Sequence, residues 1–133
     1  KIDFSARKAR RIEDITDLVD ILFPGNRNQQ HAAARILLAL KPNQPIVPNF
    51  ARLEKEHAIS RRTLQRARAK LGRLGLIERV TWMNSRYGGQ EGWRLSSRFS
   101  ASLRHLAAEV DGWRSDKRRE RIDKDERLVG MLK

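Results

Sequence analysis

Apolar side chains recur at intervals of three and four residues over two stretches near the start of the chain, with polar side chains between them. The stretches run from about residue 7 to 23 and from about 28 to 41. Such spacing places the apolar side chains on one face of a helix. FPGN at 23–26 and KPNQPIVPN at 41–49 end the two patterns, because proline and glycine interrupt helices. The sequence therefore predicts two amphipathic helices, whose apolar faces contain Ile12, Ile15, Leu18, Val19 and Leu22 in the first and Ala33, Ile36, Leu37 and Leu40 in the second.

A short helix and a longer basic helix are predicted directly after these prolines. Asn49 is suited to cap the short helix FARLEKEH at 50–57, and Ser60 is suited to cap the helix at 60–74. AIS at 58–60 forms a tight turn between them. Leucine and alanine occupy one arc of the second helix, and basic residues occupy the opposite arc. The apolar arc contains Leu64, Ala67, Leu71 and Leu74, and the opposite arc contains Arg62, Arg66, Ala69 and Arg73, with Gln65 at its edge.

The pattern changes after Gly75, where apolar and polar residues begin to alternate. Residues 76–82 and 92–96 are rich in strand-forming residues, and the loop MNSRYGGQE between them contains two glycines that suit a hairpin turn. Helical spacing returns from Ser97, and the stretch from 115 onward is mixed in charge and forms either an exposed helix or a frayed tail. The apolar residues of the helix after the hairpin are Phe99, Leu103, Leu106, Ala107, Val110 and Trp113. The predicted fold is mainly α-helical with a small β-hairpin.

The charge of the chain is strongly positive and unevenly distributed. Lys and Arg number 29 against 16 Asp and Glu, which gives a net charge of +13. Residues 48–75 hold eight of these bases and only two acids, and a uniform solubility charge would not produce such a concentration. The excess indicates a nucleic acid or an acidic membrane surface as the partner, because a polyanion neutralises like charge.

The sequence offers little for a metal site, a catalytic centre or a membrane span. It contains no cysteine, no local pair of histidines, no phosphate-binding glycine motif and no recognisable catalytic triad. Asp14, Asp17 and Asp20 could gather a metal, but their three-residue spacing is typical of the solvent face of a helix. No signal peptide or apolar run of about 18 residues occurs. We therefore expect a cytoplasmic protein without enzymatic activity, cofactor or membrane association.

The segment NFARLEKEHAISRRTLQRARAKLGRLGLIERV at 49–80 resembles the DNA-binding core of winged-helix regulators of the GntR and MarR kind. It is also similar to the winged-helix domains of phage and plasmid replication proteins. The matching positions are Phe50, Ala51 and Leu53, then AIS at 58–60, RRTL at 61–64 and LGRLGLIER at 71–79. The resemblance implies a winged helix-turn-helix with extra N- and C-terminal helices. Ala58 stands where many relatives carry glycine, which predicts a slightly different turn geometry.

By this resemblance, residues 49–57 are the support helix, residues 60–74 the recognition helix that enters the major groove, and residues 83–90 the wing. Ser60, Arg61 and Thr63 would contact phosphates, and Arg62, Gln65, Arg66 and Ala69 would contact bases. The other expected DNA-binding residues are Lys70 and Arg73 on the same helix and Asn84, Arg86 and Tyr87 in the wing. The alternative for Tyr87 is packing on the hairpin. Trp82 and Trp93 are expected in the core beneath the wing.

We interpret the chain as a sequence-preferring double-stranded DNA-binding protein. Its role would be that of a transcriptional regulator or of a phage or plasmid replication or partition factor. Two alternatives stay open, because winged helices serve several functions: an RNA-binding or ribosome-associated structural protein, and a protein–protein adaptor.

The DNA-binding domain would span residues 1–113, with the helix-turn-helix at about 49–74 and the wing at about 76–96. Residues 114–133 would form a charged C-terminal extension. A homodimer is expected, because the apolar stripes of the first helix and of the helix after the hairpin exceed what a small core can cover.

Overall fold

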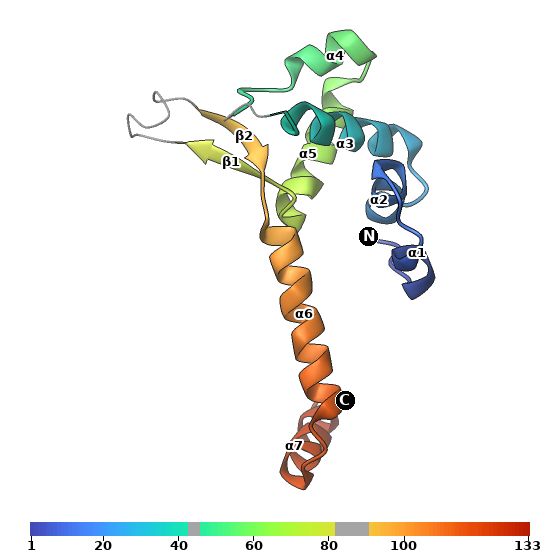
Figure 1. Cartoon of the computed structure of the whole chain (residues 1–133), viewed down its shortest axis with the longest axis vertical. Coiled ribbons are helices and arrows are strands. Elements are labelled where there is room, and N and C mark those ends of the chain that lie inside the picture. Colours follow the sequence, from blue (N-terminus) through green and yellow to red (C-terminus); the bar gives the residue numbers. More distant parts are fainter. Residues whose placement is uncertain (43–45, 82–90) are drawn as a thin grey trace. The chain divides into compact units, whose positions relative to one another are not determined.

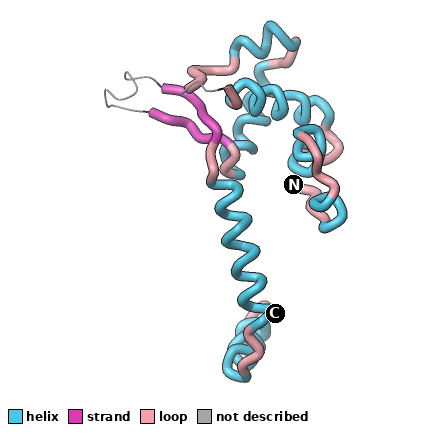
Figure 2. The backbone as a smooth tube through the Cα atoms, in the orientation of Figure 1, coloured by secondary structure: helices cyan, strands magenta, loops and turns pink. Residues whose placement is uncertain are grey.

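The computed structural model describes residues 1–42, 46–81 and 91–133. Within these ranges the chain is mainly helical, with seven helices and one two-stranded antiparallel sheet (Figures 1 and 2). It divides into two units, residues 1–99 and residues 100–133. The elements are α1 (Ala6–Arg10), α2 (Ile15–Leu22), α3 (Arg27–Leu40), α4 (Ala51–His57), α5 (Arg61–Leu74), β1 (Ile77–Thr81), β2 (Glu91–Leu95), α6 (Arg98–Ser115) and α7 (Arg119–Gly130).

The region predicted as one helix at 7–23 contains two helices, α1 and α2, so the prediction of a continuous helix was wrong. Asp14 starts the second of them, because its carboxylate accepts the backbone N–H groups of Thr16 and Asp17 at 2.9 and 3.2 Å. Ser5 caps α1 in the same way. The apolar period continues across residues 11–14, but a side-chain oxygen that satisfies free N–H groups begins a new helix there.

The core of the first unit is built from one face each of α2, α3 and α5 together with β1. The largest fully buried side chains are Leu22, Ile36, Leu71 and Ile77, one from each of these elements. The predicted apolar arc of α5 is confirmed, since Leu64, Ala67 and Leu71 are buried and Leu74 packs against the core. Each buried aliphatic side chain of this size stabilises the fold by about 1.5–3 kcal/mol.

The apolar stripe predicted for the N-terminal helix packs inside this same unit. Val19 and Leu22 are buried, Ile15 and Leu18 pack against the core, and only Ile12 of the five is largely exposed. The expectation that this stripe serves a second chain was therefore wrong. The short amphipathic helix α2 needs this burial for its own stability, because an isolated helix of two turns is marginal in water.

The two strands form the predicted hairpin, with Arg79 opposite Trp93. Val47 adds a single bridge to the other edge of β2, where its N–H donates to the carbonyl of Trp93 at 3.0 Å and its carbonyl accepts at 2.8 Å. Gly92 permits this close approach, because a Cβ at that position would lie 2.1 Å from Cγ2 of Ile46. The segment before α4 is thereby held against the hairpin that follows α5.

The second unit consists of α6 beyond Phe99 together with α7. The charged end of the chain is helical, which decides between the two alternatives that the sequence left open. The indole N–H of Trp113 donates to a carboxylate oxygen of Asp125 at 3.1 Å and ties α6 to α7. This unit begins at Ser100, whereas the sequence predicted a boundary after Trp113. Phe99 packs against the core of the first unit, but the large apolar residues that follow it on α6 are exposed.

Candidate nucleic-acid interface

The turn between α4 and α5 holds Ala58 in the left-handed conformation, with φ 52° and ψ 42°. Glycine is favoured in this region because the Cβ of any other residue is crowded there. Ala58 thus has the backbone geometry of a turn glycine, and the expectation of an altered turn is not supported. Three residues, 58–60, separate the two helices.

Ser60 caps α5 as the sequence predicts. Its hydroxyl oxygen accepts the backbone N–H of Thr63 at 3.2 Å, and the two hydroxyl groups lie 2.8 Å apart. Asn49 does not hold the corresponding place in α4, where the N-cap is Phe50 without a side-chain hydrogen bond. The Asn49 carboxamide oxygen instead accepts the N–H of Ala51 at 3.0 Å, so the predicted cap was wrong by one position.

The outward face of α5 carries cations that the rest of the described chain leaves unneutralised. Arg62, Arg66 and Arg73 are exposed, and no ion pair or hydrogen bond to another described residue engages their side chains. Gln65 and Ala69 are exposed on the same face. Residues 60–74 contain no Asp or Glu that could neutralise this face from within the helix. The structure therefore presents the predicted base-reading residues together on one surface, which we call the arginine face of α5.

The basic residues beside this face are engaged within the chain. Arg61 donates from Nε to a carboxylate oxygen of Glu54 at 3.3 Å, so this predicted phosphate ligand is paired with an acid of α4. The guanidinium of Arg68 lies 5.0 Å from the ring centre of Trp93, which itself packs against the core. The predicted core position of Trp93 is thus confirmed. Arg68 was absent from the predicted set, although its place at the margin of the apolar arc could have indicated a packing role.

Lys70 lies on the opposite margin of α5. Its ammonium group is 4.7 Å from the ring centre of Phe23 and donates to the backbone carbonyl of Lys1. Burial, and then the charge of Arg73, lowers the pKa of Lys70. Burial disfavours the charged ammonium, and the neighbouring guanidinium of Arg73 adds like-charge repulsion to that effect.

A cavity of about 310 Å³ opens between the start of α3 and the outward side of α5. Its lining contains cations and neutral side chains but no acid. The lining residues are Lys1, Phe23, Pro24, Asn26, Gln29, Arg66, Lys70 and Arg73. We call this hollow the basic pocket. Its donors suit a phosphate oxygen, because ammonium, guanidinium and amide groups all donate hydrogen bonds to anions.

The predicted wing residues Asn84, Arg86 and Tyr87 lie outside the described residues, as does Trp82. Their expected roles stay predictions. The hairpin is described as far as Thr81 on one strand and from Glu91 on the other.

Asp14, Asp17 and Asp20 each accept hydrogen bonds from neighbouring groups of the chain. Asp14 caps α2, and the Thr16 hydroxyl that donates to it lowers its pKa. Asp17 accepts the backbone N–H of Glu13 at 3.0 Å, and Asp20 accepts from the side chain of Gln30 at 3.4 Å. No group of three or more potential metal ligands occurs among residues 1–42, 46–81 and 91–133.

None of the described helices is both long and apolar enough to cross a membrane. Comparison of the chain with protein-family models, with curated proteins and with solved structures gave no match.

Proposed function

We propose that residues 46–95 form a winged helix-turn-helix that binds double-stranded DNA, with α4 as the support helix and α5 as the recognition helix. The order α4, turn, α5, β1, β2 supports this proposal (Figure 1). The left-handed Ala58 in the turn and the bridge from Val47 to β2 support it as well. In modules of this kind the recognition helix enters the major groove while the support helix crosses the backbone.

The observation that carries the proposal is the arginine face of α5. Arg62 and Arg66 can each donate two hydrogen bonds to a guanine edge, and Gln65 can address adenine in the same way. Ala69 has no bulk that would keep the helix axis away from the base pairs. An exposed row of unpaired arginines is costly by self-repulsion unless a polyanion approaches it.

Phosphates would be held on both sides of this face. The basic pocket with Lys70 and Arg73 lies on one side, and Ser60 and Thr63 at the start of α5 provide hydroxyl groups for a second phosphate. Arg86 would reach the adjacent phosphates from the wing. These contacts fix the position of the protein on the duplex, whereas the base contacts select the sequence.

The biological role that fits such a module is sequence-preferring DNA binding as a transcriptional regulator or as a replication or partition factor of a phage or plasmid. The fold alone does not distinguish these roles, because the same module serves each of them.

The test is a binding measurement with the full chain on a duplex selected from a random library, repeated on a random duplex and on structured RNA. Arg62→Ala and Arg66→Ala should each weaken binding to the selected duplex by about 1–3 kcal/mol, or roughly 5- to 150-fold, and reduce discrimination against random DNA. Arg127→Ala on α7 removes the same charge from an exposed helix of the other unit and serves as the control.

The salt dependence of binding identifies the phosphate contacts. Arg86→Ala should weaken binding to all duplexes alike and lower the slope of log K against log salt by about one unit. Tighter binding to structured RNA than to any duplex would favour an RNA-binding protein. If the chain binds neither nucleic acid with salt-dependent affinity, the proposal is refuted. A protein–protein adaptor is then the interpretation that remains.

A further inference from the structure

Four large apolar side chains on α6 are exposed to solvent although they share one face of the helix. Leu103, Leu106, Val110 and Trp113 have exposed fractions of 47, 59, 50 and 60%. All four belong to the second unit, so none of them is needed for the core of the first. A continuous apolar surface of this kind on a charged helix indicates an interface.

The spacing of these residues alternates between three and four, which is the heptad pattern of a coiled coil. Leu103 and Val110 take the a positions, and Leu106 and Trp113 take the d positions. A β-branched residue at a and leucine at d favour two parallel strands, as Val110 and Leu106 provide here. We call these four residues the α6 seam.

The charges beside the seam complement a second copy of the same helix. Glu109 takes a g position and Arg114 takes the e position five residues later. In a parallel pair each g residue faces the following e residue of the other strand, so Glu109 would face Arg114 of the partner subunit twice by symmetry. In an antiparallel pair centred on the same seam, Glu109 would face its own copy, and like charges would repel.

These two charged residues are free to exchange partners. Glu109 lies 3.9 Å from His105, and Arg114 lies 3.6 Å from Asp111, in pairs whose side chains are all at least 70% exposed. Pairs so open to water contribute little to stability, because solvent screens their attraction. Contact with a second copy can therefore replace them at little cost.

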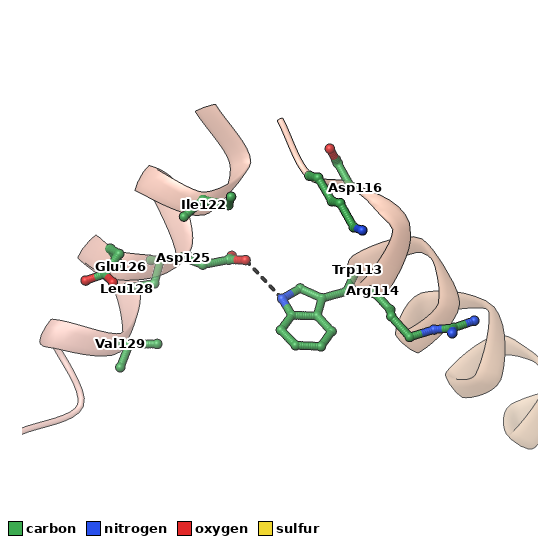
Figure 3. A pocket seen from close by; sticks show the side chains of 9 residues that line it. Trp113, Arg114, Asp116, Ile122, Asp125, Glu126, Leu128 and Val129 are labelled. Atoms are coloured by element: carbon green, nitrogen blue, oxygen red, sulfur yellow. Dashed lines mark hydrogen bonds between the residues drawn. The ribbon is translucent and has the colours of Figure 1, made fainter. Parts of the chain in front are cut away.

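We propose that α6 is the dimerisation surface of this chain, in which two copies pair in parallel through the α6 seam. A hollow of about 650 Å³ lies between the end of α6 and α7, and both apolar and charged side chains line it. Trp113 points from α6 toward α7 in this hollow, which Ile122, Leu128 and Val129 also line (Figure 3). The seam covers only two heptads, fewer than a coiled coil usually needs by itself, so we expect a dissociation constant in the micromolar range.

Sedimentation of the full chain without DNA, from low to high micromolar concentration, tests this proposal independently of DNA binding. The mass should rise from the 15.5 kDa of one chain toward twice that value. Glu109→Arg alone and Arg114→Glu alone should each weaken the dimer at least about tenfold, because each places like charges on both sides of the seam. An equimolar mixture of the two variants should dimerise again, because both pairs then regain opposite charges.

Arg104→Glu is the matched control, since it reverses a charge on the same exposed helix at a b position, away from the seam. It should leave the dissociation constant unchanged. A chain that stays at 15.5 kDa at every concentration overturns the proposal. The parallel pairing of two copies is also overturned if the single charge reversals leave the dissociation constant unchanged, or if the mixture of the two variants stays monomeric. The α6 seam would then contact a different partner.

Discussion

Substitution of Ala58 by glycine should stabilise the first unit, which is the reverse of what glycine usually does. A residue with a Cβ pays about 1–2 kcal/mol in the left-handed conformation. Glycine removes this cost but adds about 0.4–1 kcal/mol, because the unfolded chain gains freedom. Ala58 is exposed, so no packing is lost. The expected net gain in the free energy of unfolding lies between about 0 and 1.6 kcal/mol, with a central value of about 0.8 kcal/mol.

Ala69→Gly provides the matched control, because it makes the same chemical change at an exposed position inside α5. It should cost about 1 kcal/mol, the ordinary penalty of glycine in a helix. Urea unfolding followed by tryptophan fluorescence measures both variants. A Trp113→Phe background confines the signal to Trp82 and Trp93 of the first unit. If both glycine variants lose stability equally, Ala58 is not left-handed and the proposed helix-turn-helix loses its turn.

Two further predictions concern the sheet and the second unit. Gly92→Ala should destabilise the first unit by roughly 1–3 kcal/mol in thermal unfolding, because its Cβ would meet Ile46, whereas Gly112→Ala has open space and should not destabilise. Asp116 accepts hydrogen bonds from Arg118, which lower its pKa from 3.8 to about 2. Because the folded pKa is the lower one, this contact stabilises the protein above about pH 4 and is lost as the pH falls through about 2. NMR titration of the carboxyl group measures this pKa, and a value near 4 would contradict the contact.

The helices of the first unit could be predicted from the sequence because periodicity alone decides which faces are apolar. Leu64, Ala67 and Leu71 of α5 have the expected burial. The break before α2 was missed, because Asp14 interrupts the backbone without interrupting the apolar period. A capping side chain can start a new helix without changing the spacing of the apolar residues. The apolar pattern therefore does not reveal the break.

The fate of the two flanking apolar stripes could not be predicted from their patterns. Each stripe repeats at intervals of three and four residues, and each lies beside charged residues. Only tertiary packing shows that Val19 and Leu22 enter the core, whereas Leu106 and Val110 stay exposed. The sequence therefore predicted surplus apolar surface on both helices, whereas of these two stripes the structure leaves mainly that of α6 exposed.

The basic residues of α5 could be sorted only in part by sequence, because a helical wheel places Arg68 and Lys70 at the margins of the apolar arc but does not show which groups they contact. Folding engages Arg61, Arg68 and Lys70 with Glu54, Trp93 and Phe23.

The arginine face of α5 keeps its repulsion in the free chain. Arg62 and Arg66 are like-charged neighbours at helical spacing within this face, and Lys70 at its margin forms two more such pairs, with Arg66 and with Arg73. Each such pair costs about 0.2–0.5 kcal/mol. No described acid relieves Arg62, Arg66 or Arg73. These arginine side chains make no contact with the described residues that would stabilise the fold and offset this cost. We therefore propose that the arginine face binds a polyanionic partner. Duplex binding would reverse the cost, so DNA should raise the unfolding temperature of the first unit most strongly at low salt.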